Sequence, residues 1–360
     1  MTPVKKARPL VISMGDPAGI GAEIIMKAAA ELAQIGASSN LLVIGDVAEM
    51  CAAADRIGSV LTGKPGGKVR GSLPRPVEWS PGSPWPEDPS TLAVLPVSHL
   101  PAPARRPGRP TVEGADASYR YVVEGARMAL SDNASGLVTA PISKEWVNRA
   151  GHKIPGHTEL LAEMSGTRLW RMMFTGRTLR LALVTVHIGL ARVPRALTIE
   201  GVFDTIRLLA RHMRERLGFE RPRIAVLGLN PHAGENGLFG SEEERVITPA
   251  IKRARRAGID TFGPLSPDTA FARPAGEFAF DAAVAMYHDQ GLIALKALEF
   301  DSAVNVTLGI PFVRTSPDHG TAFDIAGSGR ANPSSMIAAI EYASRAGGGR
   351  QSSQRRRGAA

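Results

Sequence analysis

The chain has 360 residues, of which 44% are hydrophobic and 21% are charged, so it is long enough for two domains of ordinary size. This average composition excludes a wholly disordered chain, a collagen-like fibre and a coiled coil. No uncharged apolar run reaches about 18 residues, so no transmembrane helix is expected, and the short run after the basic N-terminus does not predict a secretory signal. Cys51 is the only cysteine, which excludes an intrachain disulfide and favours the cytoplasm.

The net charge of +9 is concentrated at the two ends of the chain. Seven cations lie in the first eight and last eleven residues, and leaving them out lowers the net charge from +9 to +2. They are Lys5, Lys6, Arg8, Arg350, Arg355, Arg356 and Arg357. Aromatic residues make up only 5% of the chain, too few for an obvious base-stacking surface. The nearly neutral body therefore argues against nucleic-acid binding, and residues 347–360 are expected to form a disordered basic tail.

Apolar runs alternate with helical patterns along most of the chain. Buried strands are predicted at 9–14, 41–45, 136–139, 179–187, 223–229 and 281–287. Helices are predicted at 21–33, 115–131, from about Ser143, at 199–217, 241–257 and 334–344. Repeated β-then-α units of this kind predict layered α/β domains with largely parallel sheets.

The segment 64–110 differs from its surroundings in composition. It holds 12 of the 27 prolines, which excludes a regular helix because proline lacks the backbone N–H that a helix needs. The segment is therefore expected to form extended edge strands and loops.

Three of the eight histidines follow predicted strands directly: His187, His232 and His288. Ligands of open α/β sheets bind at the carboxyl ends of the strands. Imidazole is a common ligand of divalent transition metals, and three histidines leave coordination positions for a substrate. Each histidine alone is better explained as a half-buried, hydrogen-bonded residue. The three together, with Asp268 and Asp289 nearby, favour a metal site.

Two further groups of residues favour an anionic ligand. Residues 156–159 open a predicted helix whose backbone N–H groups suit an anion, although ordinary capping by Thr158 explains the pattern equally well. Lys296, Asn305 and Arg314 lie in an apolar segment. A cation buried there needs a counter-charge such as a phosphate or carboxylate, and the alternative is a solvated strand edge.

Two glycine-rich loops lie near the two ends of the alternating pattern of predicted strands and helices. Residues 14–21 form a strand-to-helix turn without the G-x-G-x-x-G spacing of dinucleotide-binding folds, so they indicate only a close approach of backbone to another group. Residues 319–333 lead through several glycines into the last helix. Asp324 in this loop could accept both hydroxyls of a nucleotide ribose, or could cap a turn or helix.

Five motifs, in chain order, resemble those of the PdxA family of pyridoxal 5′-phosphate biosynthesis. They are 141–144, 156–159, 230–235, 287–291 and 314–321, within a resemblance that runs from about residue 9 to 343. The resemblance implies two α/β/α layered domains with a cleft between them, like isocitrate and isopropylmalate dehydrogenases, in a homodimer with shared active sites. We expect a first domain of 1–137 plus 306–346, with the proline-rich segment, and a second of 138–305 with the metal and dimer contacts.

The same resemblance implies a role for each candidate residue. His187, His232 and His288 match the metal ligands, one of them donated by the neighbouring subunit. The substrate-binding residues match His157, Thr158, Lys296, Asn305 and Arg314. Asp324 would hold the adenosine ribose and Asn332 the adenine, and the carboxylate at Asp324 would repel a 2′-phosphate, which favours NAD over NADP. Asp268 and Asp289 are the candidate catalytic carboxylates, either orienting histidines or moving protons.

The implied reaction is NAD-dependent oxidation of 4-phosphooxy-L-threonine, followed by β-decarboxylation to 3-amino-2-oxopropyl phosphate. One divalent ion (Zn²⁺, Co²⁺, Mn²⁺ or Mg²⁺) would bind the hydroxyl and carboxylate of this phosphorylated hydroxy acid and stabilise the enolate formed as CO₂ leaves.

Two alternatives remain open. Residues 14–17, 155–161 and 234–240 are closer to a sister branch that acts on D-threonate or D-erythronate 4-phosphate in sugar-acid catabolism. A metal- and nucleotide-binding protein without catalysis is the more remote alternative. The segment 64–110 and the basic tail match no motif of the family.

Overall fold

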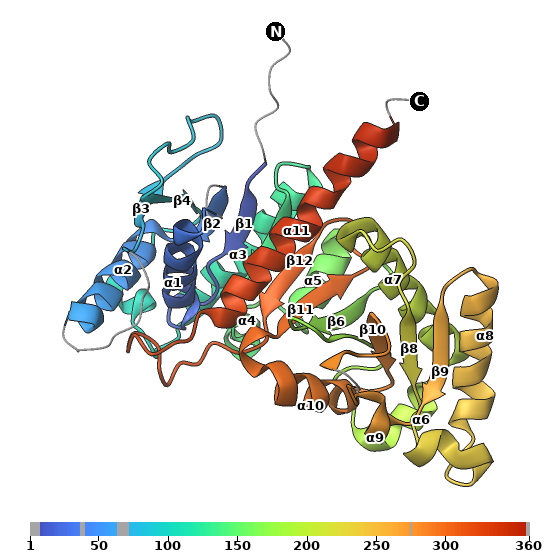
Figure 1. The fold of residues 1–360 in the computed structure, drawn as a ribbon. Coiled ribbons are helices and arrows are strands. Elements are labelled where there is room, and N and C mark those ends of the chain that lie inside the picture. Colours follow the sequence, from blue (N-terminus) through green and yellow to red (C-terminus); the bar gives the residue numbers. More distant parts are fainter. Residues whose placement is uncertain (1–7, 37–39, 63–71, 274–275, 358–360) are drawn as a thin grey trace. The chain divides into compact units, whose positions relative to one another are not determined.

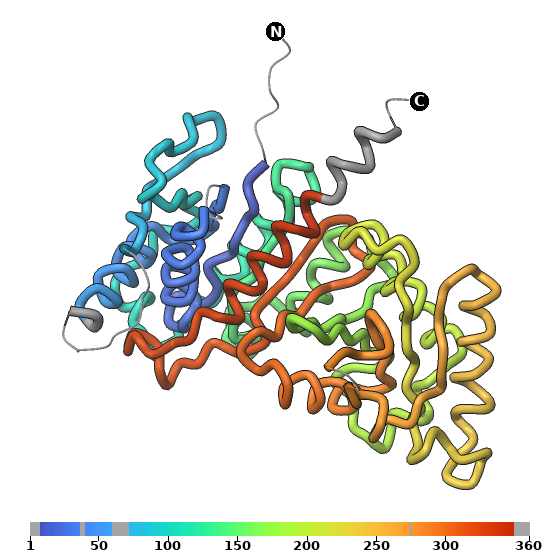
Figure 2. The backbone as a smooth tube through the Cα atoms, viewed as in Figure 1, coloured from blue at the N-terminus to red at the C-terminus, as the bar shows by residue number. Residues whose placement is uncertain are grey.

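The structure, a computed structural model, describes residues 8–36, 40–62, 72–273 and 276–357 (Figures 1 and 2). The chain forms two compact units, the first made of 1–168 and 310–347 and the second of 169–309 and 348–360. Strands and helices alternate in both units, so the predicted α/β fold class is confirmed. No helix in the described part of the chain is long and apolar enough to cross a membrane.

The first unit is built on six strands in the order β3-β4-β2-β1-β5-β12. They are β1 (Leu10–Ser13), β2 (Leu41–Gly45), β3 (Arg75–Glu78), β4 (Thr91–Pro96), β5 (Gly136–Thr139) and β12 (Arg314–Pro317). Every pairing among them is parallel. β1 and β2 are buried along their whole length, as expected for parallel strands that are covered on both faces.

The helices of the first unit follow these strands. They are α1 (Gly21–Gln34), α2 (Val47–Thr62), the 3₁₀ turn η1 (Ala102–Arg105), α3 (Val112–Leu130), α4 (Lys144–Arg149), α5 (His157–Met164) and α11 (Ser334–Arg357). The hydroxyl of Thr111 accepts a hydrogen bond from Gly114 N at 3.0 Å and so caps α3. α3 then packs against β1, β2 and β5.

The second unit is built on six strands in the order β11-β6-β7-β10-β8-β9. They are β6 (Arg171–Thr175), β7 (Arg180–Leu183), β8 (Ile224–Leu227), β9 (Thr261–Leu265), β10 (Ala282–Ala285) and β11 (Val304–Leu308). β6 runs antiparallel to both β7 and β11, whereas β7, β10, β8 and β9 are parallel. The prediction of largely parallel sheets therefore fails at β6, where only four residues separate β6 from β7 and leave no room for a crossover.

The helical segments of the second unit surround these strands. They are η2 (Leu190–Arg192), α6 (Val193–Ala196), α7 (Ile199–Leu217), η3 (Pro231–Gly237), the π-turn η4 (Glu243–Ile247), α8 (Thr248–Arg256), α9 (Pro267–Ala270), α10 (His288–Glu299) and η6 (Phe300–Ser302). The core of the unit lies between β6, β7, β8 and β10 and the helix α10.

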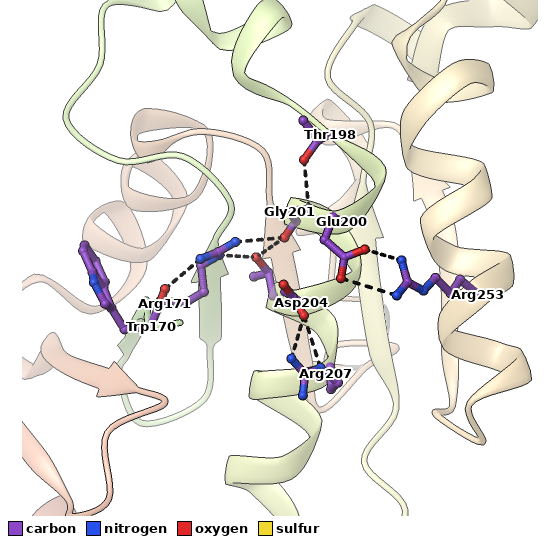
Figure 3. A network of polar contacts seen from close by, with 9 residues as sticks. Trp170, Arg171, Thr198, Glu200, Gly201, Asp204, Arg207 and Arg253 are labelled. Atoms are coloured by element: carbon purple, nitrogen blue, oxygen red, sulfur yellow. Dashed lines mark hydrogen bonds and ion pairs between the residues drawn. The ribbon is translucent and has the colours of Figure 1, made fainter. Parts of the chain in front are cut away.

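A polar network joins β6, α7 and α8 in the second unit (Figure 3). Arg171 of β6 donates from Nε to Thr205 Oγ1 at 2.8 Å and from Nη2 to Gly201 O at 3.4 Å. Burial lowers the pKa of Arg171, partly offset by Asp204. On the other side of α7, Glu200 pairs with Arg253 of α8. The helix is thus held to its sheet and to its neighbouring helix by charged side chains as well as by apolar packing.

The structure divides the chain differently from the expected domains. Residues 138–168, expected in the second domain, belong to the first unit, because β5 pairs in parallel with β1 and α5 packs against α3. The last helix, predicted to end at 344, continues to Arg357, across the start of the expected disordered tail. In the proline-rich segment, β3 is an edge strand as predicted and carries Pro76, while residues 64–71 lie outside the described residues.

A buried ion pair holds α1 to the loop that precedes α11. Lys27 Nζ donates to Glu23 Oε1 at 2.7 Å and to the backbone oxygens of Gly329 and Ala331 at 2.8 Å each. Glu23 Oε1 also accepts a hydrogen bond from Ala331 N at 2.9 Å. Both side chains are more than nine-tenths buried, so the three ammonium hydrogens are satisfied without water.

Replacing Lys27 by methionine should leave a buried carboxylate and two backbone oxygens without their donor. We expect Lys27→Met to lower the free energy of unfolding by about 3–5 kcal/mol, measured by urea denaturation. The control is Arg149→Met, which breaks the exposed pair of Arg149 and Glu145 at the same i,i+4 spacing and should change stability by less than about 1 kcal/mol. Equal effects of the two substitutions would show that the buried pair contributes no more than a surface one.

Candidate active site

The second unit places the three candidate metal ligands at one edge of its sheet. β7, β10 and β8 are parallel neighbours, and His187, His288 and His232 follow their respective carboxyl ends. This is the edge at which open α/β sheets bind ligands. The predicted position of each histidine after a strand is therefore what the structure shows.

Two of the histidines share a cavity and the third lies in the next one. His187 and His288 line a cavity of about 250 Å³ and their ring centroids are 5.9 Å apart. His232 lines a cavity of about 360 Å³ together with Asp268. Tyr287 lies in the wall of both cavities. Within the described ranges, no three His, Cys, Asp or Glu side chains of this single chain come close enough to hold a metal ion.

The pair of His187 and His288 nevertheless suits a divalent metal. The Nδ1 atom of His288 lies 2.7 Å from Asp289 Oδ1, a contact that orients the ring and leaves Nε2 as the coordinating nitrogen. The two rings face one cavity with centroids 5.9 Å apart, and imidazole nitrogens bind zinc at about 2.0–2.1 Å. Two imidazoles make an incomplete set for a transition metal, so a further ligand has to come from elsewhere.

The candidate carboxylates accompany two of the histidines. Asp289 contacts His288 as described, and Asp268 lies close enough to His232 to be influenced by its charge. A hydrogen bond from Ser266 lowers the pKa of Asp268. Both aspartates are exposed to solvent, so they are available as charged partners of the imidazoles.

The backbone at two of the histidines is strained. His187 and His232 both have φ of 52°, in the left-handed region that side chains other than glycine rarely adopt. The strain continues from His232 through Ala233, Gly234, Glu235 and Asn236, all with positive φ. A left-handed residue other than glycine costs roughly 1–2 kcal/mol, and such strain gathers at functional sites.

Glu243 braces this left-handed turn. Its Oε1 accepts hydrogen bonds from Leu229 N and Asn230 N, each at 2.7 Å, and its Oε2 accepts one from Asn230 Nδ2 at 2.9 Å. A Cβ atom at Gly234 would lie 2.7 Å from Glu243 Oε2, so only glycine fits there. Sequence reasoning missed Glu243 because nothing in its local pattern distinguishes it from the exposed Glu244 beside it.

In the first unit, the candidate residues for an anionic ligand lie around the start of α5. Gly156 is the N-cap residue and no side chain caps the helix, so the alternative of ordinary capping by Thr158 is wrong. Thr158 is buried, and the Nε2 atom of His157 is buried with no hydrogen-bond partner. Burial, followed by the charges of Arg314 and Lys144, lowers the pKa of His157 well below its usual value. The imidazole is therefore neutral at physiological pH.

Arg314 brings a buried positive charge to the same place. The side chain is 2% exposed, and Nη2 donates to Thr139 Oγ1 at 2.6 Å. Burial lowers the pKa of Arg314 to about 10, against the opposing charge of Glu159. The alternative of a solvated strand edge is thus wrong for Arg314. An arginine buried beside an uncapped helix start suits a phosphate or carboxylate.

The other candidate substrate residues lie in the second unit. Lys296 is half-buried on α10, with Nζ 5.8 Å from the ring of Phe300. Asn305 lies on β11, and its Oδ1 is buried without a hydrogen-bond partner. A polar atom left unsatisfied in this way needs a partner, and a ligand can supply it.

The loop before α11 presents the two candidate nucleotide-binding residues. Asp324 is exposed, and its carboxylate makes no hydrogen bond to any described residue, so it caps neither a turn nor a helix. Asn332 Oδ1 accepts hydrogen bonds from Ser334 N at 3.0 Å and Ser334 Oγ at 2.7 Å, which fixes the start of α11. The loop itself is held by Lys27 and Glu23.

The glycine-rich turn after β1 contains the close backbone approach predicted from the sequence, and beside it lies Asp16, which sequence reasoning left out. Gly15, with φ of 79°, passes so close to Pro141 that a Cβ atom would lie 2.5 Å from its carbonyl oxygen. The predicted close approach of backbone is thus confirmed. Asp16 beside it is 1% exposed, accepts one hydrogen bond from Ala18 N at 3.0 Å and has an unpartnered Oδ2. Burial raises its pKa to about 6.

The fold and these side chains define an α/β protein whose functional groups gather at the carboxyl ends of its strands. Residues 38–343 match the family model described as pyridoxal phosphate biosynthetic protein PdxA. The chain therefore belongs to the PdxA family, and the resemblance that its motifs indicate is confirmed.

Individual relatives match nearly the whole chain. A 4-hydroxythreonine-4-phosphate dehydrogenase of Geobacter metallireducens is 50% identical over 334 residues, which cover 92% of this chain and 93% of that protein. One of Caulobacter vibrioides is 44% identical and covers 94% and 97%. The crystal structure of a 4-hydroxythreonine-4-phosphate dehydrogenase from Klebsiella pneumoniae has a TM-score of 0.79 at 38% identity and covers 95% of this chain and 100% of that one. These relatives are oxidoreductases by name.

The raised pKa of Asp16 predicts a pH-dependent effect of its substitution. Because the folded-state pKa of about 6 lies above the ordinary 3.8, ionisation opposes folding; the penalty is absent below about pH 4 and complete well above pH 6. Asp16→Asn removes the ionisable group and keeps an acceptor for Ala18 N. It should raise the free energy of unfolding by up to about 3 kcal/mol near pH 8 and by little near pH 4, in urea denaturation at the two pH values. An equal gain in the free energy of unfolding at the two pH values would contradict ionisation of buried Asp16 as its cause.

Substituting Glu243 tests the brace. In Glu243→Gln, an amide NH₂ group replaces one of the two carboxylate oxygens. This group faces an N–H donor and cannot accept its hydrogen bond, so we expect the free energy of unfolding to fall by about 2–3 kcal/mol. Amide hydrogen exchange should also accelerate in residues 229–236. Glu244→Gln, on the exposed neighbour, is the matched control and should change neither measurement. Unchanged exchange in Glu243→Gln would show that the turn keeps its shape without the brace.

Proposed function

We propose that the chain is an NAD- and metal-dependent dehydrogenase that oxidises 4-phosphooxy-L-threonine and decarboxylates the product to 3-amino-2-oxopropyl phosphate, in cytoplasmic pyridoxal 5′-phosphate biosynthesis. The observation that carries this proposal is the 50% identity, over 92% of the chain, to a relative named for that substrate. The arrangement of charged and polar groups in each unit supports it.

The phosphate of the substrate would bind where the first unit has an uncapped helix start and a buried arginine. The backbone N–H groups of His157 and Thr158 and the guanidinium of Arg314 are donors suited to phosphate oxygens. Lys296 and Asn305 are the further candidate donors to the substrate. Binding the remote phosphate tightly orients the opposite end of the substrate for reaction.

The reacting end would meet the histidines of the second unit. His187, His232 and His288 would hold one divalent ion, either Zn²⁺, Co²⁺, Mn²⁺ or Mg²⁺. When bound, such an ion lowers the pKa of the substrate hydroxyl and stabilises the negative charge that develops as CO₂ leaves. Asp289 would keep the ring of His288 oriented through Nδ1, and Asp268 would do the same for His232 or accept a proton.

The cofactor would bind at the loop before α11. The exposed carboxylate of Asp324 would accept hydrogen bonds from two ribose hydroxyls, and its charge would favour NAD over NADP. Asn332 would contact the adenine.

A homodimer would complete the metal site. The single chain brings only His187 and His288 into one cavity, so a second copy could donate the third histidine. The second unit also exposes large apolar side chains, which a partner copy would cover: Leu190, Leu238, Phe239, Ile293 and Phe300.

The alternative substrate, D-threonate or D-erythronate 4-phosphate, is favoured by the sequence of residues 234–240.

The first test compares substrates. Metal-reconstituted protein should reduce NAD, followed by NADH absorbance, with a kcat/KM for 4-phosphooxy-L-threonine at least about tenfold above that for D-erythronate 4-phosphate, a difference of about 1.4 kcal/mol in transition-state free energy. Chelation should abolish activity, and added divalent metal should restore it. The reverse preference would assign the chain to sugar-acid catabolism. Binding of metal and NAD without turnover of either substrate would leave a non-catalytic protein.

Substitution of Arg314 tests the proposed phosphate site. Arg314→Lys keeps a positive charge but loses the planar fork that holds two phosphate oxygens, so KM for the phosphorylated substrate should rise at least about tenfold while kcat changes little. Arg207→Lys, at an exposed arginine of α7 that pairs with Asp204, is the control and should leave both constants unchanged. A fall in kcat with no rise in KM would show that Arg314 acts elsewhere than on the phosphate.

A further inference from the structure

A positively charged cavity lies in the first unit. It has a volume of about 940 Å³ and is bounded by α2, η1 and residues 106–111. Four arginines line it, namely Arg56, Arg105, Arg106 and Arg109, with Glu49 as the one acidic residue in its wall. We refer to this cavity as the arginine basin. Part of its wall, residues 102–110, comes from the proline-rich segment that matches no motif of the family.

The single carboxylate of the basin is buried beneath two of the arginines. Glu49 is 1% exposed and pairs through Oε1 with Arg56. Its Oε2 lies 3.7 Å from Arg105 Nη1 and has no hydrogen-bond partner. Burial raises the pKa of Glu49 to about 7, so at neutral pH the carboxylate offsets at most one of the four positive charges.

The other two arginines have no counter-charge. The side chains of Arg106 and Arg109 are exposed, and neither guanidinium forms an ion pair or hydrogen bond with any residue that the structure describes. The two exposed guanidinium groups are therefore available to an anion at this cavity. Guanidinium groups bind phosphate oxygens in pairs, which makes a phosphate-bearing molecule the best match.

The walls of the basin are rigid. Pro103, Pro107 and Pro110 fix φ on both sides of the arginines, so little backbone freedom is lost when a ligand binds. Gly108 N donates to Ala18 O at 2.8 Å, and a Cβ atom at Gly108 would lie 2.8 Å from Phe323 O. The arginine segment is therefore packed against the loop that carries Asp324.

The basin also lies where α/β sheets bind ligands. Glu49 and Arg56 belong to the helix that follows β2, and η1 follows the carboxyl end of β4, the strand paired with β2. Gly327 of the neighbouring loop would place a Cβ atom 2.8 Å from Pro107 Cβ and 3.7 Å from Arg56 Cδ.

We propose that the arginine basin binds a small molecule carrying a diphosphate group, with Arg106 and Arg109 contacting the phosphate oxygens and Glu49 holding Arg56 and Arg105 in place. Two sources share this chemistry: the diphosphate of a dinucleotide bound at the adjacent loop, and a separate phosphorylated effector. The proposal does not depend on the proposed reaction, since binding can be measured without turnover.

The test uses inorganic pyrophosphate as the probe and the full chain. Calorimetric titration should show saturable binding that weakens as salt rises. Arg106→Ala combined with Arg109→Ala should weaken binding at least tenfold. The control combines Arg211→Ala with Arg214→Ala, which removes two exposed arginines from α7 and makes the same change in net charge. The control should bind pyrophosphate within about twofold of the unmodified chain.

Two results would overturn the proposal: no binding of pyrophosphate to the unmodified chain, or equal weakening by the basin and control substitutions. A competition arm identifies the source once binding is established. Displacement of pyrophosphate by NAD, with weaker NAD binding in the basin variant, would support the cofactor's diphosphate as the occupant. Simultaneous binding of NAD and pyrophosphate would support a separate effector. Because all arms measure binding, a failed dehydrogenase assay leaves their outcome unaffected.

Discussion

Parallel pairing of strands is the constraint on which the candidate sites of both units depend. A parallel strand must be followed by a crossover, so consecutive strands end at the same edge of their sheet and their following loops gather there. In the second unit this brings His187, His232 and His288 to one edge although they are spread over about 100 residues of the chain. In the first unit the same rule places Asp16, Glu49 and η1 after β1, β2 and β4. Chemistry at each edge therefore follows from strand order.

Placement at an edge does not by itself orient a side chain, and the second unit shows how orientation is achieved. Two of the three histidines have left-handed backbone, which turns their side chains in directions that an extended or helical residue cannot reach. The cost of the left-handed run around His232 is offset by Glu243, which satisfies three N–H donors just before the turn. The buried carboxylate thus acts on the histidine through the backbone, without touching its ring.

Buried charge is handled in different ways in the first unit. Lys27 and Glu23 neutralise each other and saturate the ammonium with backbone oxygens, so the pair is complete and serves to hold a loop. Arg314 is equally buried, near the charge of Glu159 and the uncapped start of α5, which are surroundings that suit an anion. In the proposed arginine basin, one buried carboxylate faces four guanidinium groups, of which those of Arg106 and Arg109 are exposed. A fully neutralised pair is suited to a structural role, whereas an excess of positive charge is suited to an anionic ligand.

The sequence by itself determined the α/β class, the family and the position of each histidine after a strand, because continuous apolar runs and glycine-rich turns are local signals. It did not predict β12, whose residues Arg314–Pro317 are polar yet wholly buried, since their burial comes from neighbours distant in the chain. It also could not predict that Glu243 is buried while Glu244 is exposed, that Arg314 lies beside α5, or that Arg106 and Arg109 share a cavity with α2. Only the tertiary structure decided these points, because burial and charge balance are properties of residues that meet across the fold, and no local pattern encodes which residues will meet.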